Sequence, residues 1–356
     1  IAVDDIPRTK NGKIVELAVK NTIEGNEIKN KEALANPKIL EQYKNLEELN
    51  YWMLKNIVKG LGPSSTLKIN EISRELEDKG EKIFKFGFGQ SPFQIPTDIV
   101  NALKDNAYQN KYLPMQGLKD LRETVAKYTS TKKDYNYKSE NVIIGPGSKE
   151  LMFLLHVLFD GEVILPAPSW VSYAPQAILG RNKIQVIQTT RENNWFPTGA
   201  EIEEVILKNK NKNYLLFLNS PNNPSGLICE NLEEISEIAK KYNLTILSDE
   251  IYSELSFEEG FKSISSFCPE KTIISTGLSK WCGAGGWRLG YFIVPESLNI
   301  LRDSINVLAS ETFSAVSAPI QYAAITAYTG NHNEYICNSK NILNAVGNYV
   351  YENLKS

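Results

Sequence analysis

Short apolar runs alternate with amphipathic segments along most of the chain. From about residue 140 onward, runs rich in Val, Ile and Leu predict seven β-strands, at residues 141–145, 162–168, 183–189, 214–220, 244–250, 272–277 and 290–295. Between them, Leu232, Ile235 and Ile238 recur at helical spacing in residues 231–243, with charges on the other side. This alternation predicts βαβ units, and so an α/β fold with a three-layer αβα large domain around a mainly parallel sheet.

Further helices are expected on either side of this region. Residues 117–128 place three apolar side chains on one stripe, which predicts a helix on the domain surface. Residues 295–308 and 317–330 predict two more. The first 50 residues differ, because a KNGK turn signal at residues 10–13 is followed by a polar, lysine-rich stretch. We treat that stretch as a separate segment.

Composition narrows the classes of function. A content of 42% hydrophobic and 23% charged residues is typical of a soluble protein with a core, and a net charge of -3 without a basic face argues against nucleic-acid binding. No apolar run approaches the ~20 residues that span a bilayer, and the N-terminus lacks a signal peptide's apolar stretch. We therefore expect a cytoplasmic protein whose partner is a small molecule, with no membrane association.

The cysteines and histidines of the chain argue against disulfide bonds and metal sites. The four cysteines are far apart and form no CxxC pair, so we expect reduced thiols. Of the two histidines, His156 lies in the apolar stretch LMFLLHVLF, which favours a core or helix-surface role over catalysis. Two histidines and scattered cysteines are too few for a zinc site or a histidine-based catalytic triad, so no metal site is expected.

Polar and aromatic residues follow nearly every predicted strand. Because ligands of parallel α/β sheets bind beyond the carboxyl ends of the strands, these residues are candidates for one shared site. In chain order they are Gly147 and Ser148 at a helix start, Trp170, Asn223 in a Pro-rich loop, Asp249, Tyr252, Lys280 and Arg288. Each feature alone is commonplace. Together an aromatic ring, a carboxylate, a lysine, an arginine and a helix N-terminus suit an anionic aromatic cofactor with a reactive carbonyl.

The same residues carry a family resemblance. STGLSKWCGAGGWRLGY, residues 275–291, resembles the lysine signature of class I and II aminotransferases, with Arg288 eight positions after Lys280. SPNNPSG is similar to that family's asparagine loop, SDEIY to its aspartate and tyrosine pair, and PAPSWVSY to the segment with the stacking aromatic. YLPMQGLKDLRETVAKY and FGFGQSPF also match, so the resemblance extends from about residue 60 to the C-terminus in the family's order.

The resemblance implies an enzyme dependent on pyridoxal 5'-phosphate, in which Lys280 holds the cofactor in a Schiff base. Lys280, Asp249 and Tyr252 would be the catalytic residues, with Asp249 paired to the pyridine nitrogen. The remaining cofactor-binding residues would be Gly147, Ser148, Lys149, Trp170, Asn223, Ser279, Arg288 and, reaching the neighbouring subunit of a homodimer, Tyr112. Gly89, Trp170 and Asn223 would contact the substrate. The implied reactants are an amino acid and a 2-oxo acid.

Three departures from the family accompany this match. Gly277 stands where many relatives have a phosphate-binding serine, and Ser275, Thr276 and Ser279 are the candidates to replace it. In relatives the arginine that binds the substrate's α-carboxylate lies beyond the point corresponding to residue 356, and Arg302 has a different context. We therefore expect a site that is complete for the cofactor and incomplete for the substrate.

The third departure is the N-terminus. Residues 1–48 resemble the extreme C-terminus of acetoacetyl-CoA synthetases, in which a PRTxxGK turn carries the adenylation lysine, here Lys13. We accordingly divide the chain into four segments: that tail segment at 1–48, an N-terminal arm with the start of the small domain at 49–86, the large cofactor-binding domain at 87–300, and the truncated start of the C-terminal part of that small α+β domain at 301–356. A fragment of a longer fusion would have this organisation.

An aminotransferase is the function that these observations favour. The alternatives are another reaction on the same cofactor, such as a carbon–sulfur lyase or a cyclising synthase, and a cofactor-binding but inactive fragment of a fusion protein. A ligase function based on Lys13 is the weakest hypothesis, because a single turn that carries a lysine does not bind ATP without a nucleotide-binding domain.

Overall fold

The computed structural model falls into two compact units, Ile1–Leu61 and Gly62–Ser356. It describes residues 3–23, 25–28, 30–44, 55–58, 61–62, 65–85, 87, 89–133, 135–257 and 261–355. Phe86 and Phe88 of the predicted FGFGQSPF turn lie outside the described residues. No described helix combines the length and apolar character needed to cross a membrane. The finer division of the chain into four segments stays a prediction.

The N-terminal unit has a small core of its own. Helix α1 (Glu16–Ile23) contributes Ala18, which packs with Leu34 and Leu40. The predicted KNGK turn is present, because the Thr9 N–H donates to the Lys13 carbonyl at 2.8 Å. Lys13 itself is exposed on this turn.

One mixed sheet organises the second unit. Its strands are β1 (Val142–Gly145), β2 (Glu162–Ala167), β3 (Lys183–Gln188), β4 (Tyr214–Asn219), β5 (Thr245–Asp249), β6 (Thr272–Gly277) and β7 (Gly290–Ile293). The order across the sheet is β1-β7-β6-β5-β4-β2-β3. Strand β7 runs antiparallel to both β1 and β6, and the remaining neighbours are parallel. All seven predicted strands are confirmed, and so is the mainly parallel α/β fold.

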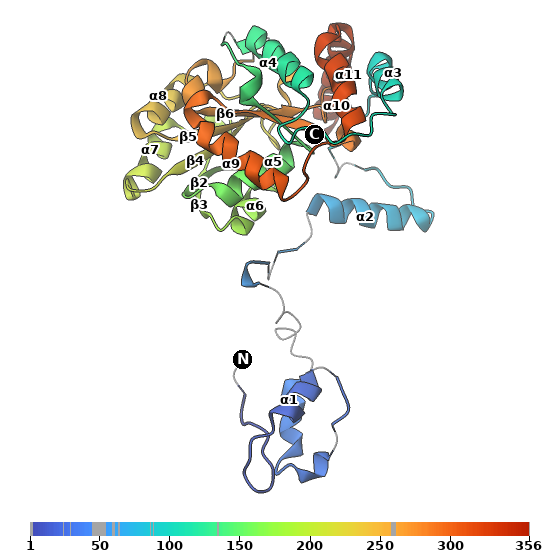
Figure 1. Ribbon diagram of the computed structural model, residues 1–356, viewed down its shortest axis with the longest axis vertical. Helices are drawn as coiled ribbons and strands as arrows, with labels where there is room; N and C mark the ends of the chain where they lie inside the picture. The colour runs from blue at the N-terminus through green and yellow to red at the C-terminus, as the bar shows by residue number, and fades with distance from the viewer. Residues whose placement is uncertain are drawn as a thin grey trace. The chain divides into compact units, whose positions relative to one another are not determined.

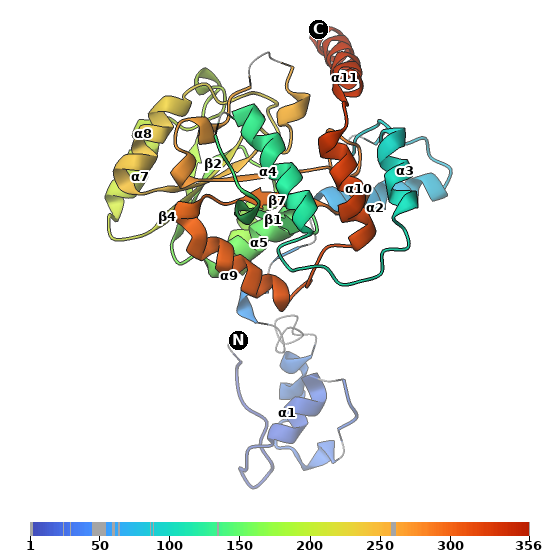
Figure 2. The ribbon, with the colours of Figure 1, turned by 45° about the horizontal axis from the view of Figure 1, so that its top comes forward.

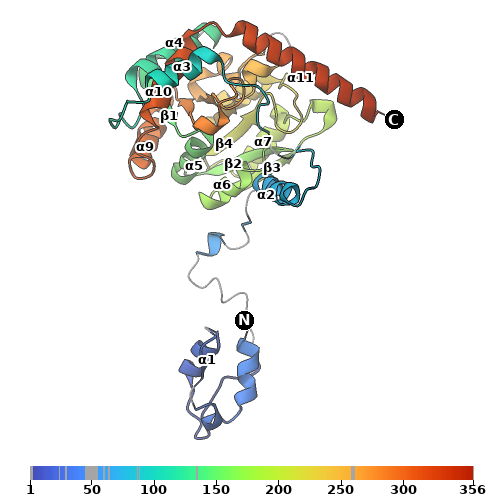
Figure 3. The same cartoon turned by 90° about the vertical axis from the view of Figure 1, so that its right-hand side faces the viewer.

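Helices connect and cover the strands (Figure 1). In chain order they are α2 (Ser65–Asp78), α3 (Thr97–Asp105), α4 (Lys119–Lys133), α5 (Ser148–Leu158), α6 (Tyr173–Leu179), α7 (Gly199–Lys208), α8 (Leu232–Tyr242), α9 (Asn299–Ser310), α10 (Ala318–Thr329) and α11 (Asn333–Leu354). The four helices expected in residues 117–128, 231–243, 295–308 and 317–330 correspond to α4, α8, α9 and α10. The long helix α11 was not predicted (Figure 3). Ser339 is the one buried residue that the structure describes in this helix, so the apolar side chains of α11 add little to the core.

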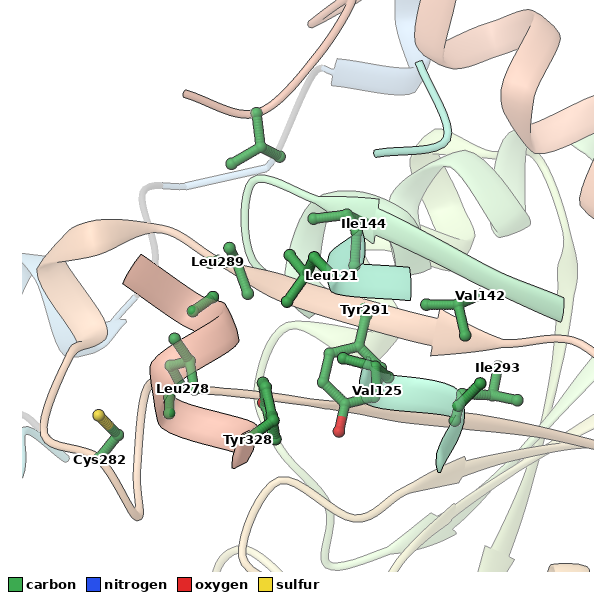
Figure 4. Packing of buried hydrophobic residues seen from close by; sticks show 14 of the residues in the cluster. Leu121, Val125, Val142, Ile144, Leu278, Cys282, Leu289, Tyr291, Ile293 and Tyr328 are labelled. Carbon is green, nitrogen blue, oxygen red and sulfur yellow. The ribbon is translucent and has the colours of Figure 1, made fainter. Parts of the chain in front are cut away.

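Strand alternation divides the core between the two faces of the sheet. On β6, Ile273 joins the cluster under α5, α6 and α9, whereas its neighbour Ile274 joins the cluster under α4 and α10. Figure 4 shows this second cluster, in which Leu121 and Val125 of α4 lie against strand residues such as Tyr291. A third cluster lies under α7 and α8, which pack side by side (Figure 2). The result is the expected three-layer arrangement.

The sheet order brings the candidate residues to one edge. Strands β1, β2, β4, β5 and β6 all end at this edge because they run in the same direction. Strand β7 runs the other way, so it begins there, and Arg288 lies just before it. A residue that precedes a strand therefore meets residues that follow the others.

Candidate active site at the carboxyl edge of the sheet

Lys280 follows β6 and points toward the loop that precedes α3. Its Nζ donates a hydrogen bond to the Gly89 carbonyl at 2.5 Å and lies 5.5 Å from the centre of the Tyr252 ring. Burial lowers the pKa of Lys280; the Asp249 carboxylate opposes this, and the Arg288 cation adds to it. The amine is therefore closer to its neutral, nucleophilic form than an exposed lysine.

Asp249 is the last residue of β5 and is almost wholly buried, with 5% exposure. The Tyr173 hydroxyl donates to its Oδ2 at 2.6 Å, and the Ile251 N–H donates to its Oδ1 at 3.3 Å. Burial nevertheless raises the pKa of Asp249 to about 6. A buried carboxylate with so few donors calls for a further cationic partner.

Asn223 and Tyr252 join the ends of β4 and β5. The Asn223 side-chain amide donates to the Tyr252 hydroxyl at 3.2 Å, and the Asn223 backbone N–H donates to Asn219 Oδ1 at 2.7 Å. The Asn219 amide in turn donates to the Asp249 carbonyl at 2.9 Å. These bonds fix the asparagine loop over the tyrosine, and they leave the Asn223 and Tyr252 polar groups beside Lys280.

A second group of candidates collects at the start of α5. Gly147, with φ 87°, precedes this helix, and a Cβ there would lie 2.3 Å from Arg288 Nη2. The Lys149 Nζ lies 5.3 Å from the centre of the Trp170 ring, and burial together with Arg288 lowers the pKa of Lys149. Among the described residues, neither cation forms an ion pair with a carboxylate. Two unbalanced cations at a helix N-terminus, where Ser148 is the first residue, make an anion site.

The glycine at position 277 has a steric cause. A Cβ on Gly277 would lie 2.7 Å from both the Gly290 Cα and the Leu289 carbonyl, so a serine does not fit without moving the backbone. Of the candidates to replace that serine, Thr276 faces the opposite side of the sheet and donates to the Glu250 carbonyl at 3.4 Å. Ser275 shares the Asp249 face, and its Oγ is fully buried without a hydrogen-bond partner among the described residues.

A cavity of about 380 Å³ opens in front of Lys280. Its described lining includes Gly89, Asn223 and Tyr252, and Lys280 is the one cation in it. Asp249, Trp170 and Arg288 are not part of that lining. Other predicted site residues are placed as follows: Ser279 immediately precedes Lys280, and Tyr112 is 96% exposed.

Arg302 does not join the site, because it pairs with Glu296 and Asp303 on and next to α9. Of the core and helix-surface roles expected for His156, the structure shows the core role, with the ring stacked on Phe217 at 4.8 Å between ring centres. The structure adds one contact that sequence reasoning missed, the hydrogen bond from Tyr173 to Asp249. Tyr173 lies in the quoted segment PAPSWVSY, but nothing local links it to a carboxylate 76 residues away.

Comparisons with known proteins agree with this geometry. The sequence profile of the family "Aminotransferase class I and II" matches residues 81–356. The aspartate aminotransferase of Bacillus sp. (strain YM-2) is 35% identical over 290 residues, which are 78% of this chain and 72% of that protein. An asparagine–oxo-acid transaminase of Streptococcus mutans is 31% identical over 284 residues, 75% of this chain and 70% of that protein.

Solved structures give the same result. The aspartate aminotransferase of Thermotoga maritima superposes with a TM-score of 0.76 at 28% identity, covering 85% of this chain and 80% of that one. The alanine aminotransferase of Pyrococcus furiosus superposes with a TM-score of 0.77 at 28% identity, covering 85% and 79%.

Proposed function

The chain belongs to the class I and II aminotransferases, which depend on pyridoxal phosphate, and from that premise we propose that Lys280 binds this cofactor and moves the proton in transamination. Family membership makes the chain an aminotransferase, an enzyme that transfers amino groups. The individual roles of its residues are our proposal. One observation supports it above the others: a lysine of lowered pKa faces a cavity beside Tyr252 and Asn223, with a buried carboxylate close by.

The residues present fit the cofactor. Arg288 and Lys149, which lack carboxylate partners among the described residues, suit a phosphate, together with the Gly147 and Ser148 backbone at the start of α5. Beside Asp249, the buried Ser275 hydroxyl has no hydrogen-bond partner among the described residues, so it is free to bond a polar group of the cofactor. When bound, pyridoxal phosphate would supply an aldehyde that condenses with amines and an aromatic ring that withdraws electrons from them.

Asp249 would hold a proton on the ring nitrogen of the cofactor. A carboxylate that is 5% exposed favours a cation beside it, because pairing offsets the cost of burying its charge. Asn223 and Tyr252 would donate to the oxygen on the ring, and Trp170 would cover one ring face. The Lys280 amine also lies over the Tyr252 ring, so both residues would contact the same part of the cofactor.

Lys280 would carry the proton of the reaction. With pyridoxal phosphate bound, the Lys280 amine in its neutral form would be placed to accept a proton from the substrate's α-carbon. As an ammonium, Lys280 would then be able to release that proton again, so one residue would serve as base and as acid. Burial and the neighbouring Arg288 cation help to keep its pKa low enough for the first step.

An amino acid and a 2-oxo acid are the reactants that we propose, with Gly89, Trp170 and Asn223 in contact with them. The relatives named above support transamination over a carbon–sulfur lyase or a cyclising synthase. We further propose a homodimer in which Tyr112, exposed in the single chain, reaches the neighbouring subunit's site. A cytoplasmic location and the role of residues 1–48 stay predictions.

Reductive labelling tests the central assignment. After incubation with pyridoxal phosphate and reduction by borohydride, peptide mapping should place the label on Lys280. Lys280→Ala should abolish the label, whereas Lys104→Ala, at an exposed position of α3, should leave it unchanged. A label elsewhere would disprove the role of Lys280. Half-transamination by a panel of amino acids then distinguishes a transaminase, which converts the bound cofactor to its amine form, from a lyase, which does not.

A further inference from the structure

Asp249 receives its shortest described hydrogen bond from Tyr173, the last residue of the PAPSWVSY segment, to which no role has been given so far. The Tyr173 hydroxyl donates to Oδ2 at 2.6 Å, a length typical of a bond from a hydroxyl to a charged carboxylate. The other described donor, the Ile251 N–H, is 3.3 Å from Oδ1. Both partners are nearly inaccessible, with exposures of 1% for Tyr173 and 5% for Asp249. Water therefore does not substitute for this bond.

Aromatic neighbours fix the Tyr173 ring in place. Trp170 packs edge-on against it with ring centres 5.3 Å apart, and Phe217 packs against it at 4.9 Å. His156 in turn stacks on Phe217. The hydroxyl is thus aimed at Asp249 by the packing of the chain's own aromatic side chains.

The hydrogen bond from Tyr173 favours the charged form of Asp249. Burial and the adjacent Asp249 raise the pKa of Tyr173 far above its ordinary value, so its hydroxyl keeps its proton and remains a donor. Around Asp249, the Glu250 carboxylate opposes the charged form, the Lys280 ammonium favours it, and Tyr252 and Ser275 are uncharged neighbours. Tyr173 is therefore the main side chain that stabilises the anion, ahead of Lys280.

We propose that Tyr173 is a positioning residue for transamination, whose hydroxyl holds the Asp249 carboxylate ionised and oriented toward the ring nitrogen of the cofactor. This inference rests on the proposed function. Asp249 and the ring nitrogen would share one proton, on the nitrogen in the active pairing and on the carboxylate in an inactive one. A donor to the carboxylate stabilises the first arrangement more than the second, because its hydrogen bond to a charged oxygen is the stronger one. Loss of the donor shifts the proton toward Asp249 and weakens the electron withdrawal that transamination needs.

Tyr173→Phe is the test, with Tyr214→Phe as the matched control. Tyr214 is also buried and donates one hydrogen bond, to the Asn209 carbonyl at 3.1 Å at the other end of β4. With cofactor labelled by ¹⁵N in its ring, the nitrogen resonance should move toward the unprotonated value in Tyr173→Phe and stay unchanged in Tyr214→Phe. The rate of half-transamination should fall roughly 10- to 100-fold, with a smaller change in KM.

A double variant separates positioning from general structural damage. If Tyr173 acts through Asp249, adding Tyr173→Phe to Asp249→Asn should cost little further rate. Additive losses, or an unchanged nitrogen resonance in Tyr173→Phe, would overturn the proposal. If Tyr173→Phe does not fold, 3-fluorotyrosine at this position keeps the ring and strengthens the donor, so the resonance should move the opposite way or the proposal fails. Failure of the unmodified protein to bind cofactor through Lys280 would instead refute the proposed function.

Discussion

Replacing Asp249 with Asn should stabilise the cofactor-free protein at neutral pH and change its stability little at pH 4. In the folded protein, burial raises the pKa of Asp249 from its ordinary value of 3.8 to about 6. A carboxyl group with a raised folded pKa contributes stability that is present below the unfolded pKa and is lost as the pH rises through the folded pKa. At about 1.4 kcal/mol for each tenfold change, the loss between pH 4 and 7 is roughly 3 kcal/mol. Asn does not ionise and escapes this cost.

The assay compares unfolding midpoints of the two proteins between pH 4 and 8. Tryptophan fluorescence follows the unit Gly62–Ser356, because four of the five tryptophans lie there. The difference between the proteins is the informative quantity, since His156 changes stability in the opposite direction over the same pH range. Burial lowers the pKa of His156 to about 4, so its contribution is lost as the pH falls from about 6.5. The unmodified protein alone can therefore show a nearly flat profile.

A control variant and a measurement with bound cofactor complete the test. Asp105→Asn, at an exposed position of α3, should follow the unmodified protein at every pH. Saturating pyridoxal phosphate should reverse the order of stability, because only the carboxylate gains a cationic partner when the cofactor binds. If Asp249→Asn were no more stable than the unmodified protein at pH 7, or equally stabilising at pH 4 and 7, the buried-charge reasoning would be refuted.

Three other variants test separate parts of the structure. His156→Phe should lose the acid-side fall in stability between about pH 6.5 and 4, worth roughly 3 kcal/mol, and a steep remaining fall in its denaturation midpoints would count against the buried neutral histidine. Gly277→Ala should destabilise by about 1–3 kcal/mol in urea, since its Cβ would meet backbone at 2.7 Å, whereas Gly286→Ala, with open space, should change stability by about 0.5 kcal/mol or less. Arg288→Ala should weaken pyridoxal-phosphate binding about 10- to 100-fold in a fluorescence titration, and Arg302→Ala should not; equal affinities would remove Arg288 from the phosphate site.

Much of the fold could be predicted from the sequence, because the patterns that indicate strands and helices are local. Each of the seven strands is a short apolar run bounded by turn residues, and α4, α8 and α9 carry an apolar stripe at helical spacing. The candidate site could be predicted for a related reason. Strand ends meet at one edge of a parallel sheet, so Asp249 after one run and Lys280 after another had to approach each other. The spacing from Lys280 to Arg288 is local too.

Only the tertiary structure decided how these pieces combine. Hydrophobic alternation does not encode strand order, so the insertion of β7 between β1 and β6 in the opposite direction, which carries Arg288 to the shared edge, depends on long-range pairing. Packing also made Gly277 a requirement, through backbone atoms on the neighbouring strand. The bond from Tyr173 to Asp249 joins residues 76 positions apart. A sequence states which groups can donate and accept, but their pairing depends on distances that exist only once the core has packed.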